Sequence, residues 1–177
     1  MSHEDHLAAV FPLIKQVNAE GRAVQIGSHG DEAVLMPSEQ YTQWADTAYL
    51  FKSPANGKRL LGAYEHALAG SFREHEMPFE APEREGLAIR LTWADEAWED
   101  YNSWRDEDPE LFERINTLLV AALKEPGEGV GHPVAHKYGT TRAWSRDITD
   151  VHRLVYMMEE DEEFGTADLI VLQARYH

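Results

Sequence analysis

The sequence predicts an α+β protein made of two unlike halves that are joined by an extended connector. Two hydrophobic patterns support this: apolar residues spaced three and four apart mark helices, and residues that alternate between apolar and polar mark strands. A third observation is the stretch over residues 71–86, which is rich in proline and glutamate and follows neither pattern. We therefore expect this stretch to be an extended connector.

The first half opens with a helix and a hairpin of strands. Apolar residues recur at helical spacing from Leu7 to Val17, and a glycine follows as a stop signal. Two short stretches then alternate apolar and polar residues on either side of a His-Gly-Asp turn. We expect them to pair as antiparallel strands over residues 22–28 and 32–36.

Two further helices follow, and a serine precedes each of them. Ser38 is expected to cap the first, whose apolar face includes Tyr41 and Trp44. Ser53 is expected to cap the second, because Pro54 then falls at the first helical position, where proline is favoured. A glycine ends the apolar stripe of this second helix, so the helix should stop close to residue 70.

The second half predicts a β-α-α-β-β-β unit with an antiparallel sheet. Its first strand covers residues 87–93, an aromatic-rich helix follows, and Asp108-Pro109 is a strong start for the next helix. The glycine-rich residues 127–139 are expected to form a loop. The remaining strands are predicted at residues 143–149, 152–158 and 168–177, with the acidic residues 159–163 as a solvated hairpin tip.

The strongly acidic composition restricts the partners of this protein. The net charge is −16 at pH 7, of which residues 1–86 carry −6 (13 acidic and 7 basic residues) and residues 87–177 carry −10 (19 acidic and 9 basic residues). Cations dominate the affinity of proteins for phosphates. We therefore expect DNA or RNA to bind only through a local basic patch.

Composition also bears on cofactors and location. Cysteine is absent, which excludes disulfides and thiolate metal sites, and we expect neither a metal nor another cofactor. No apolar stretch approaches the roughly 20 residues that a membrane helix needs, so no membrane partner is expected. The first residues lack the basic and apolar regions of a secretory signal, and we therefore expect a cytoplasmic location.

Two stretches resemble the two components of bacterial type II toxin–antitoxin systems. Residues 32–61 contain EAVLM, EQY and DTAYLFKSPANGKRLL, which resemble the Phd/YefM antitoxins. Residues 89–177 contain RLTWADEAWEDYNSW, WSRDITDVHRLVY and ARYH, which resemble the YoeB branch of the RelE-like toxins. The resemblance implies a fusion of an antitoxin domain (residues 1–53), a toxin-neutralising helix and connector (54–86) and a toxin domain (87–177).

The toxin resemblance implies a metal-independent endoribonuclease that cuts messenger RNA on the ribosome. In this reaction a base takes the 2′-OH proton, the oxygen attacks the adjacent phosphate, and an acid protonates the leaving oxygen. Carried over by position, Arg153 would stabilise the charge that develops on phosphorus, and His177 would be the acid. Arg146 and Lys137 would be supporting cations.

Departures from the toxin pattern predict reduced or absent activity. The resembling toxins carry their base, a glutamate, at the position of Val134, and losing a general base typically costs about 10²–10⁴-fold in rate. Asp147 also stands where those toxins have a second cation. Either His132 or His136 could replace the base, whereas a metal site built on this histidine pair is disfavoured because no third ligand is evident nearby.

The antitoxin resemblance implies homodimerisation through the first domain and a segment that covers the toxin half, either in its own chain or in a partner copy. The residues expected to neutralise the toxin are Leu60, Leu61, Tyr64, Leu68, Met77 and Phe79. Operator binding is expected to be weak, because Ser28 stands where the resembling antitoxins have an arginine. Lys15 and Arg22 would be the remaining DNA contacts.

Three functions stay open on the sequence alone. The first is an endoribonuclease held inactive by its own antitoxin half, which would meet messenger RNA and the ribosome only after release. The second is a catalytically inactive protein that binds related toxins or antitoxins. The third is a DNA-binding autorepressor. Val134 and the acidic charge favour the second over the first, and Ser28 argues against the third.

Overall fold

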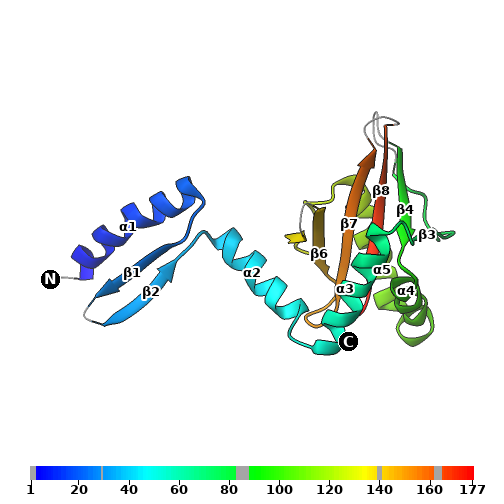
Figure 1. Ribbon diagram of the computed structural model, residues 1–177, viewed down its shortest axis with the longest axis horizontal. Coiled ribbons are helices and arrows are strands. Elements are labelled where there is room, and N and C mark those ends of the chain that lie inside the picture. Colours follow the sequence, from blue (N-terminus) through cyan, green and yellow to red (C-terminus); the bar gives the residue numbers. More distant parts are fainter. Residues whose placement is uncertain (1–2, 29, 83–87, 139–140, 162–164) are drawn as a thin grey trace. The chain divides into compact units, whose positions relative to one another are not determined.

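The computed structural model describes residues 3–28, 30–82, 88–138, 141–161 and 165–177 (Figure 1). Within these ranges, side chains are not described for residues 3–9, 28, 137, 138 and 161. The chain folds as two compact units, residues 1–46 and residues 47–177, so the division falls inside the helix α2 (Ser38–Leu50). The last turn of α2 therefore belongs to the larger unit. The sequence-based boundaries after residues 53 and 86 remain predictions.

The smaller unit contains a helix and a two-stranded hairpin, as the sequence predicts. These elements are α1 (His3–Glu20), β1 (Val24–Ser28) and β2 (Asp31–Leu35), and the two strands pair antiparallel. Among the described side chains of this unit, Val17 is the one hydrophobic side chain that is buried. Phe11, Tyr41 and Trp44 are exposed. The predicted apolar faces of α1 and α2 thus exist, but within this unit they enclose very little core.

In the larger unit, the last turn of α2 is followed by the helix that the sequence predicts after Ser53. The side chain of Ser53 caps α3 (Pro54–Leu68), because its oxygen accepts the backbone N–H of Asn56 and Pro54 occupies the first turn. The connector that follows is not wholly without regular structure, which corrects the sequence-based expectation. Its residues Arg73–Glu74 form a short strand, β3, that pairs antiparallel with the first strand of the second half.

The second half confirms the predicted α+β class and the order of its helices. Its elements are β4 (Ala88–Trp93), α4 (Asp95–Glu107), α5 (Pro109–Lys124), β5 (Val134–Tyr138), β6 (Thr141–Asp147), β7 (Arg153–Asp161) and β8 (Thr166–Gln173). Asp108 caps α5 through its carboxylate, as expected. Part of the predicted glycine-rich loop is instead β5, an edge strand of the sheet. Its residues His136 and Lys137 interrupt the alternation of apolar and polar residues from which a strand would have been predicted.

The strands form one six-stranded sheet in the order β3-β4-β8-β7-β6-β5. All pairs are antiparallel except β4 with β8, which run parallel, so the sheet is mixed rather than purely antiparallel. The first and last strands of this half can lie parallel because two helices and three strands separate them in the chain. The predicted hairpin tip (residues 159–163) is wrong in part, because residues 159–161 belong to β7 and pair with β8, whereas residues 162 and 163 fall outside the described residues.

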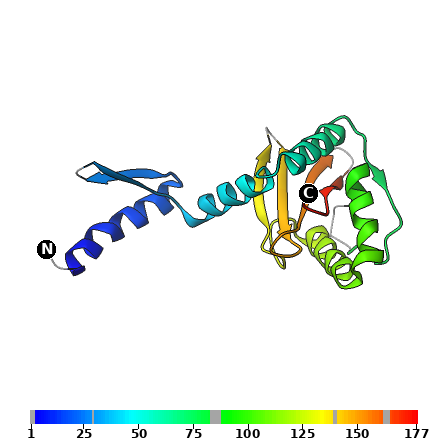
Figure 2. The ribbon, with the colours of Figure 1, turned by 90° about the horizontal axis from the view of Figure 1, so that it is seen from below.

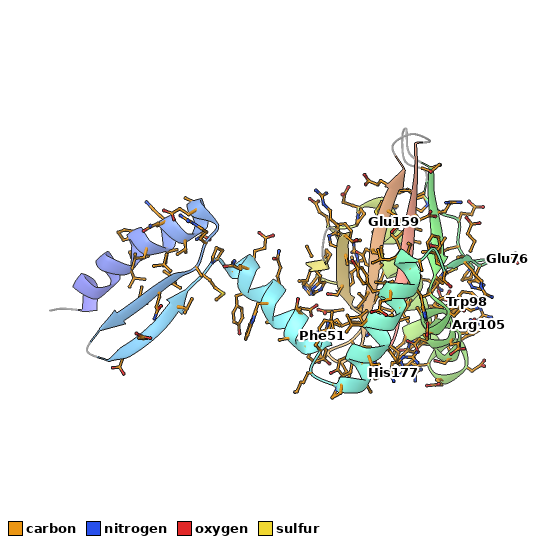
Figure 3. The ribbon with its side chains drawn as sticks, viewed as in Figure 1. Phe51, Glu76, Trp98, Arg105, Glu159 and His177 are labelled. Carbon is orange, nitrogen blue, oxygen red and sulfur yellow. The ribbon has the colours of Figure 1, made fainter. Side chains whose placement is uncertain are left out.

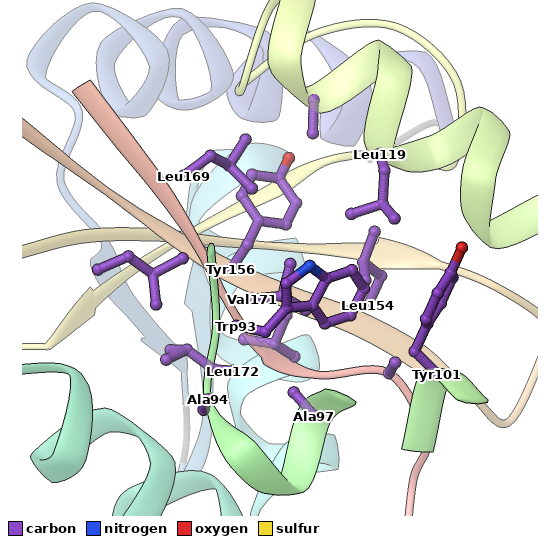
Figure 4. Close-up of a cluster of buried hydrophobic side chains, with 14 of the residues drawn as sticks. Trp93, Ala94, Ala97, Tyr101, Leu119, Leu154, Tyr156, Leu169, Val171 and Leu172 are labelled. Carbon is purple, nitrogen blue, oxygen red and sulfur yellow. The ribbon is translucent and has the colours of Figure 1, made fainter. Parts of the chain in front are cut away.

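Helices cover both faces of this sheet. Figures 1 and 2 together show α3 on one face and α5 on the opposite face. On the α5 side, Leu119 packs with Trp93, Leu154 and Val171 in a cluster of buried side chains (Figure 4). On the other side, α3 packs on β8 and buries Leu60 together with two alanines. The central strands are consequently shielded from water on both faces, as their continuous apolar runs require.

Candidate functional site

Arg153, the predicted phosphate-stabilising residue, lies at the start of β7 and is held on two sides. Its Nε lies 2.9 Å from Oδ1 of Asp147, and its Nη1 donates to the carbonyl oxygen of Thr149 at 2.9 Å. Its Cζ sits 4.8 Å from the ring centroid of Tyr49, in a cation–π geometry. Only 13% of the side chain is exposed. The guanidinium is therefore oriented by a carboxylate and covered by an aromatic ring from α2.

Tyr49 also binds the end of the chain. Its hydroxyl donates to the carbonyl of Val151 at 2.8 Å, and its ring stacks on Tyr176 with centroids 4.9 Å apart. The hydroxyl of Tyr176 in turn donates to the Tyr49 carbonyl (3.3 Å) and accepts the backbone N–H of Ser53 (3.1 Å). The end of α2 and Ser53 are thus joined to Tyr176 by stacking and by two hydrogen bonds, and a third hydrogen bond joins Tyr49 to Val151.

His177, the predicted general acid, contacts the first turns of α3. Its backbone N–H donates to Oδ1 of Asn56 at 3.0 Å, and its Nε2 lies 2.9 Å from Oδ1 of Asp100. Figure 3 shows His177 beside the start of α3. Arg59 of α3 places its Nη2 2.9 Å from the same oxygen of Asp100. A carboxylate of the toxin half is thereby shared between the predicted acid and an arginine of the antitoxin half.

Asp100 is buried on α4, and two opposing effects act on the pKa of its carboxyl group. Burial raises the pKa of its carboxyl, because the charged form loses hydration. The positive groups of His177 and Arg59 act in the opposite direction and favour the carboxylate. The buried charge is therefore tolerable because it has partners on two sides.

Arg146 has a different role from the one predicted, since it is a structural residue and not a cation facing RNA. The residue is fully buried on β6. It donates to the hydroxyl of Tyr156 (2.7 Å) and to four carbonyl oxygens, those of Glu125 (2.8 Å), Pro126 (3.2 Å), Glu128 (2.7 Å) and Val130 (2.5 Å). Burial raises the pKa of Tyr156 to about 12. Arg146 thus fixes the loop after α5 against the sheet.

The two histidines considered as substitute bases lie in unlike surroundings. His136 is buried between hydroxyls, with Nδ1 2.9 Å from Oγ1 of Thr47 and Nε2 2.9 Å from Oγ of Ser145. His132 is exposed, and its Nδ1 lies 3.4 Å from Oδ2 of Asp147, the carboxylate that also holds Arg153. Val134 opens β5 opposite Ser145. The side chain of Lys137 lies outside the described residues.

The residues predicted to neutralise the toxin are not all in contact with it. Leu60 is buried, and Tyr64, Met77 and Phe79 pack partly buried against the core. Leu61 and Leu68 are 45% and 53% exposed and do not anchor the helix within this chain. Besides Leu60, the buried residues of the helix are small ones, and these are Asn56, Gly57, Ala63 and Ala67. The connector adds His75, whose ring stacks on Trp98 with centroids 3.8 Å apart.

Several residues of this site were missed by sequence reasoning, although they lie within the motifs that it used. They are Tyr49, Asn56, Arg59, Asp100, Asp147 and Tyr176. Lys15 and Arg22, the predicted DNA contacts, are both exposed in the smaller unit, where Arg22 pairs with Glu20 at 3.0 Å. In the described part of the chain no three acidic or histidine side chains converge as a metal site would require. Nor does any described helix combine the length and apolarity needed to span a membrane.

Comparison with known proteins assigns the two halves separately. The family model "Antitoxin Phd_YefM, type II toxin-antitoxin system" matches residues 10–69, and the model "YoeB-like toxin of bacterial type II toxin-antitoxin system" matches residues 93–177. The toxin YoeB of Streptomyces coelicolor is 39% identical over 89 residues, which are 50% of this chain and 99% of that toxin. The antitoxin YefM of the same organism is 44% identical over 68 residues, which are 38% of this chain and 78% of that antitoxin.

Solved structures of toxin–antitoxin proteins are also similar to part of this chain. The YoeB/ParE toxin from Agrobacterium tumefaciens has 36% sequence identity and a TM-score of 0.45, covering 49% of this chain and 97% of its own. The heterotetrameric YoeB-YefM complex from Staphylococcus aureus contains a chain with 30% identity and a TM-score of 0.42, covering 50% of this chain and 97% of its own.

Replacing Arg146 tests its structural role. We expect Arg146→Met to lower the free energy of unfolding by about 3 kcal/mol, because several buried carbonyls lose their donor at once. Arg142→Met is the matched control on the same strand, where the side chain is exposed, and it should change stability by less than about 0.5 kcal/mol. Urea unfolding followed by tryptophan fluorescence measures both. Equal stability of the two variants would contradict this role.

His152 makes the site sensitive to acid. Its Nδ1 accepts the backbone N–H of Tyr176 at 3.2 Å, and its ring meets the edge of Trp104. Burial, assisted by the positive charge of Arg175, lowers the pKa of His152 below its ordinary value of 6.5. The folded protein thus resists a proton that the unfolded chain accepts, so this residue destabilises the fold as pH falls through about 6.5.

We therefore expect His152→Gln to reduce the loss of unfolding free energy between pH 7 and pH 5. Glutamine removes the titrating group and retains an acceptor for the N–H of Tyr176. His66→Gln, at an exposed position of α3, should follow the parent protein. Urea titrations at a series of pH values give the slope, and an unchanged slope in His152→Gln would rule out this origin of the acid sensitivity.

Proposed function

We propose that this chain, which belongs to the YefM antitoxin family through its first part and to the YoeB toxin family through its second, is a self-neutralised messenger-RNA endonuclease. The observation that carries the proposal is that both predicted catalytic residues contact the antitoxin part of the same chain. Tyr49 covers the guanidinium of Arg153, and Asn56 binds the backbone of His177. A phosphate could reach Arg153 only after Tyr49 has moved away.

The chemistry assigned to the toxin half follows from the side chains at this site. The 2′-oxygen of RNA attacks the adjacent phosphorus, the bond to the 5′-oxygen breaks, and the products are a 2′,3′-cyclic phosphate and a 5′-hydroxyl. Arg153, oriented by Asp147, would stabilise the negative charge on the phosphorane-like centre. His177 would give its proton to the leaving oxygen. Val134 cannot accept a proton, and the reaction is therefore slow unless another residue serves as base.

Neutralisation combines packing with charge. α3 lies on β8 and buries Leu60, which supplies apolar contact area. Arg59 and His177 share the carboxylate of Asp100, because both bind its Oδ1. The link between the halves holds the inhibitor at an effective concentration in the millimolar range or above, so dilution does not release it. Because Tyr49 and α3 contact the toxin half of their own chain, neutralisation in cis is favoured over an exchange of these segments between two copies.

The smaller unit supports the remaining parts of the proposal. It encloses one buried hydrophobic side chain among those described, and it exposes Phe11 and Val34, so a second copy would complete its core as a homodimer. Operator binding is weak in this proposal, because Arg22 is already paired with Glu20 and the chain is acidic. We place the protein in the cytoplasm, where messenger RNA and ribosomes are.

A second candidate function is a catalytically inactive protein that binds related toxins or antitoxins. The observation that favours it is the half-buried, apolar Val134 at the position where the general base is expected. The two candidate functions differ in one testable outcome, which is whether the protein cuts RNA once Tyr49 no longer covers Arg153.

Removing the ring of Tyr49 in the full chain tests the proposal. We expect Tyr49→Ala to increase cleavage of a ribo-oligonucleotide at least tenfold over the unaltered chain and to slow bacterial growth, because Arg153 becomes accessible. Adding Arg153→Ala should abolish both effects. Tyr41→Ala, at an exposed position of the same helix, is the matched control. A folded Tyr49→Ala chain that binds RNA but leaves it intact would favour the inactive binding protein.

A further inference from the structure

The loop after α5 is held in one conformation against β6. Arg146 donates to the carbonyl oxygens of Glu125, Glu128 and Val130, and the backbone N–H of Asp147 donates to the carbonyl of Gly131 at 2.7 Å. Gly131 itself has φ +84°, and a β-carbon there would lie 2.5 Å from Cδ2 of the buried Leu118. Only glycine fits this position, so the path of the chain into the next residue is fixed.

This fixed loop presents His132 in an unusual backbone conformation. His132 has φ 47°, in the left-handed region that residues with a β-carbon seldom adopt. Such a conformation persists only where its surroundings enforce it, and it occurs preferentially at functional sites. No packing gain accounts for it here, because 91% of the side chain is exposed.

The imidazole of His132 is next to Arg153 through a shared carboxylate. Nδ1 of His132 lies 3.4 Å from Oδ2 of Asp147, and Oδ1 of the same group lies 2.9 Å from Nε of Arg153. A carboxylate that faces Nδ1 favours the tautomer with the proton on that nitrogen, which leaves the lone pair on Nε2. The carboxylate that orients the guanidinium of Arg153 therefore also lies against an imidazole whose Nε2 can accept a proton.

His136 does not offer the same arrangement. Both of its ring nitrogens face hydroxyl groups at 2.9 Å, and the residue is buried beneath Thr47. A base must reach the 2′-OH of the substrate within hydrogen-bond distance. Of the two histidines that flank Val134, His132 is the one exposed to an incoming RNA.

We infer that Nε2 of His132 is the general base of the toxin half, in place of the acidic residue expected at Val134; this rests on the proposed ribonuclease function. The 2′-OH proton passes to Nε2, and the electron pair of that oxygen forms the new bond to phosphorus. The bond from phosphorus to the 5′-oxygen breaks, and His177 protonates the leaving oxygen. One proton is taken and one is given, so His132 and His177 exchange protonation states and no co-reactant is needed.

The test uses the full chain opened by Tyr49→Ala and a short ribo-oligonucleotide. His132→Asn is the informative variant, because asparagine tolerates the left-handed conformation but cannot act as a base. We expect it to lower the cleavage rate at least 100-fold. His66→Asn, an exposed histidine on α3, should leave the rate unchanged.

The pH profile separates a base from a structural role. The charged group that contacts His132 is Asp147 on β6, and Asp147 is bound in turn by Arg153 on β7 and by Arg114 on α5, whose Nη2 donates to the Asp147 carbonyl at 3.2 Å. Adding Val134→Glu to His132→Asn should restore part of the rate. It should also move the acidic limb of the profile, where the base loses its proton, to lower pH, because a carboxylate loses its proton at lower pH than an imidazole.

The possible outcomes distinguish this inference from the function on which it rests. Cleavage by the opened chain that His132→Asn does not reduce overturns the inference and leaves the ribonuclease function standing. Cleavage that appears only after Val134→Glu is added has the same meaning, because the site then works but His132 does not serve it. If the opened chain does not cut RNA, either with His132 in place or after Val134→Glu is added, the proposed function is contradicted and this inference fails with it.

Discussion

The larger unit depends on covering β8 on both faces. Leu169, Ile170, Val171 and Leu172 are all buried, although successive residues of a strand face opposite sides. One helix cannot shield both sets. α5 covers the face that carries Leu169 and Val171, and α3 packs on the other. The helix that resembles an antitoxin segment is therefore part of the core of the toxin half, and under the proposed function inhibition and folding would share the same apolar contacts.

The same packing places the polar contacts at the site. Because α3 is fixed on the sheet, its first turns bring Asn56 to His177 and Arg59 to Asp100. Each such hydrogen bond contributes only about 1 kcal/mol net, and a charge-assisted one somewhat more. Burial of apolar side chains such as Leu60 supplies about 1.5–3 kcal/mol each. The packing of α3 thus holds this segment against the sheet. The hydrogen bonds and the stacked Tyr49 determine its contacts with Arg153 and His177.

Residues close together in the sequence predicted the helices well, but they could not predict which distant residues come into contact. Ser53 with Pro54 and Asp108 with Pro109 fix helix starts within a few residues, so their effect is readable in sequence. The edge strand β5 was missed because its ladder depends on β6, not on its own pattern. The apolar face of α3 was predicted from its larger apolar residues. In the structure, the close approach of α3 to the sheet buries its alanines and leaves Leu61 exposed.

The sequence by itself determined the order of the helices, the two unlike halves and the residue types available for chemistry at Arg153 and His177. Only the tertiary structure decided which groups meet. It buried Arg146 against loop carbonyls, set His136 apart from His132, and brought Tyr49 over a guanidinium about a hundred positions away. The physical reason is that spacing along the chain fixes the face of an element, whereas side-chain partners follow from sheet order and from how helices pack on it.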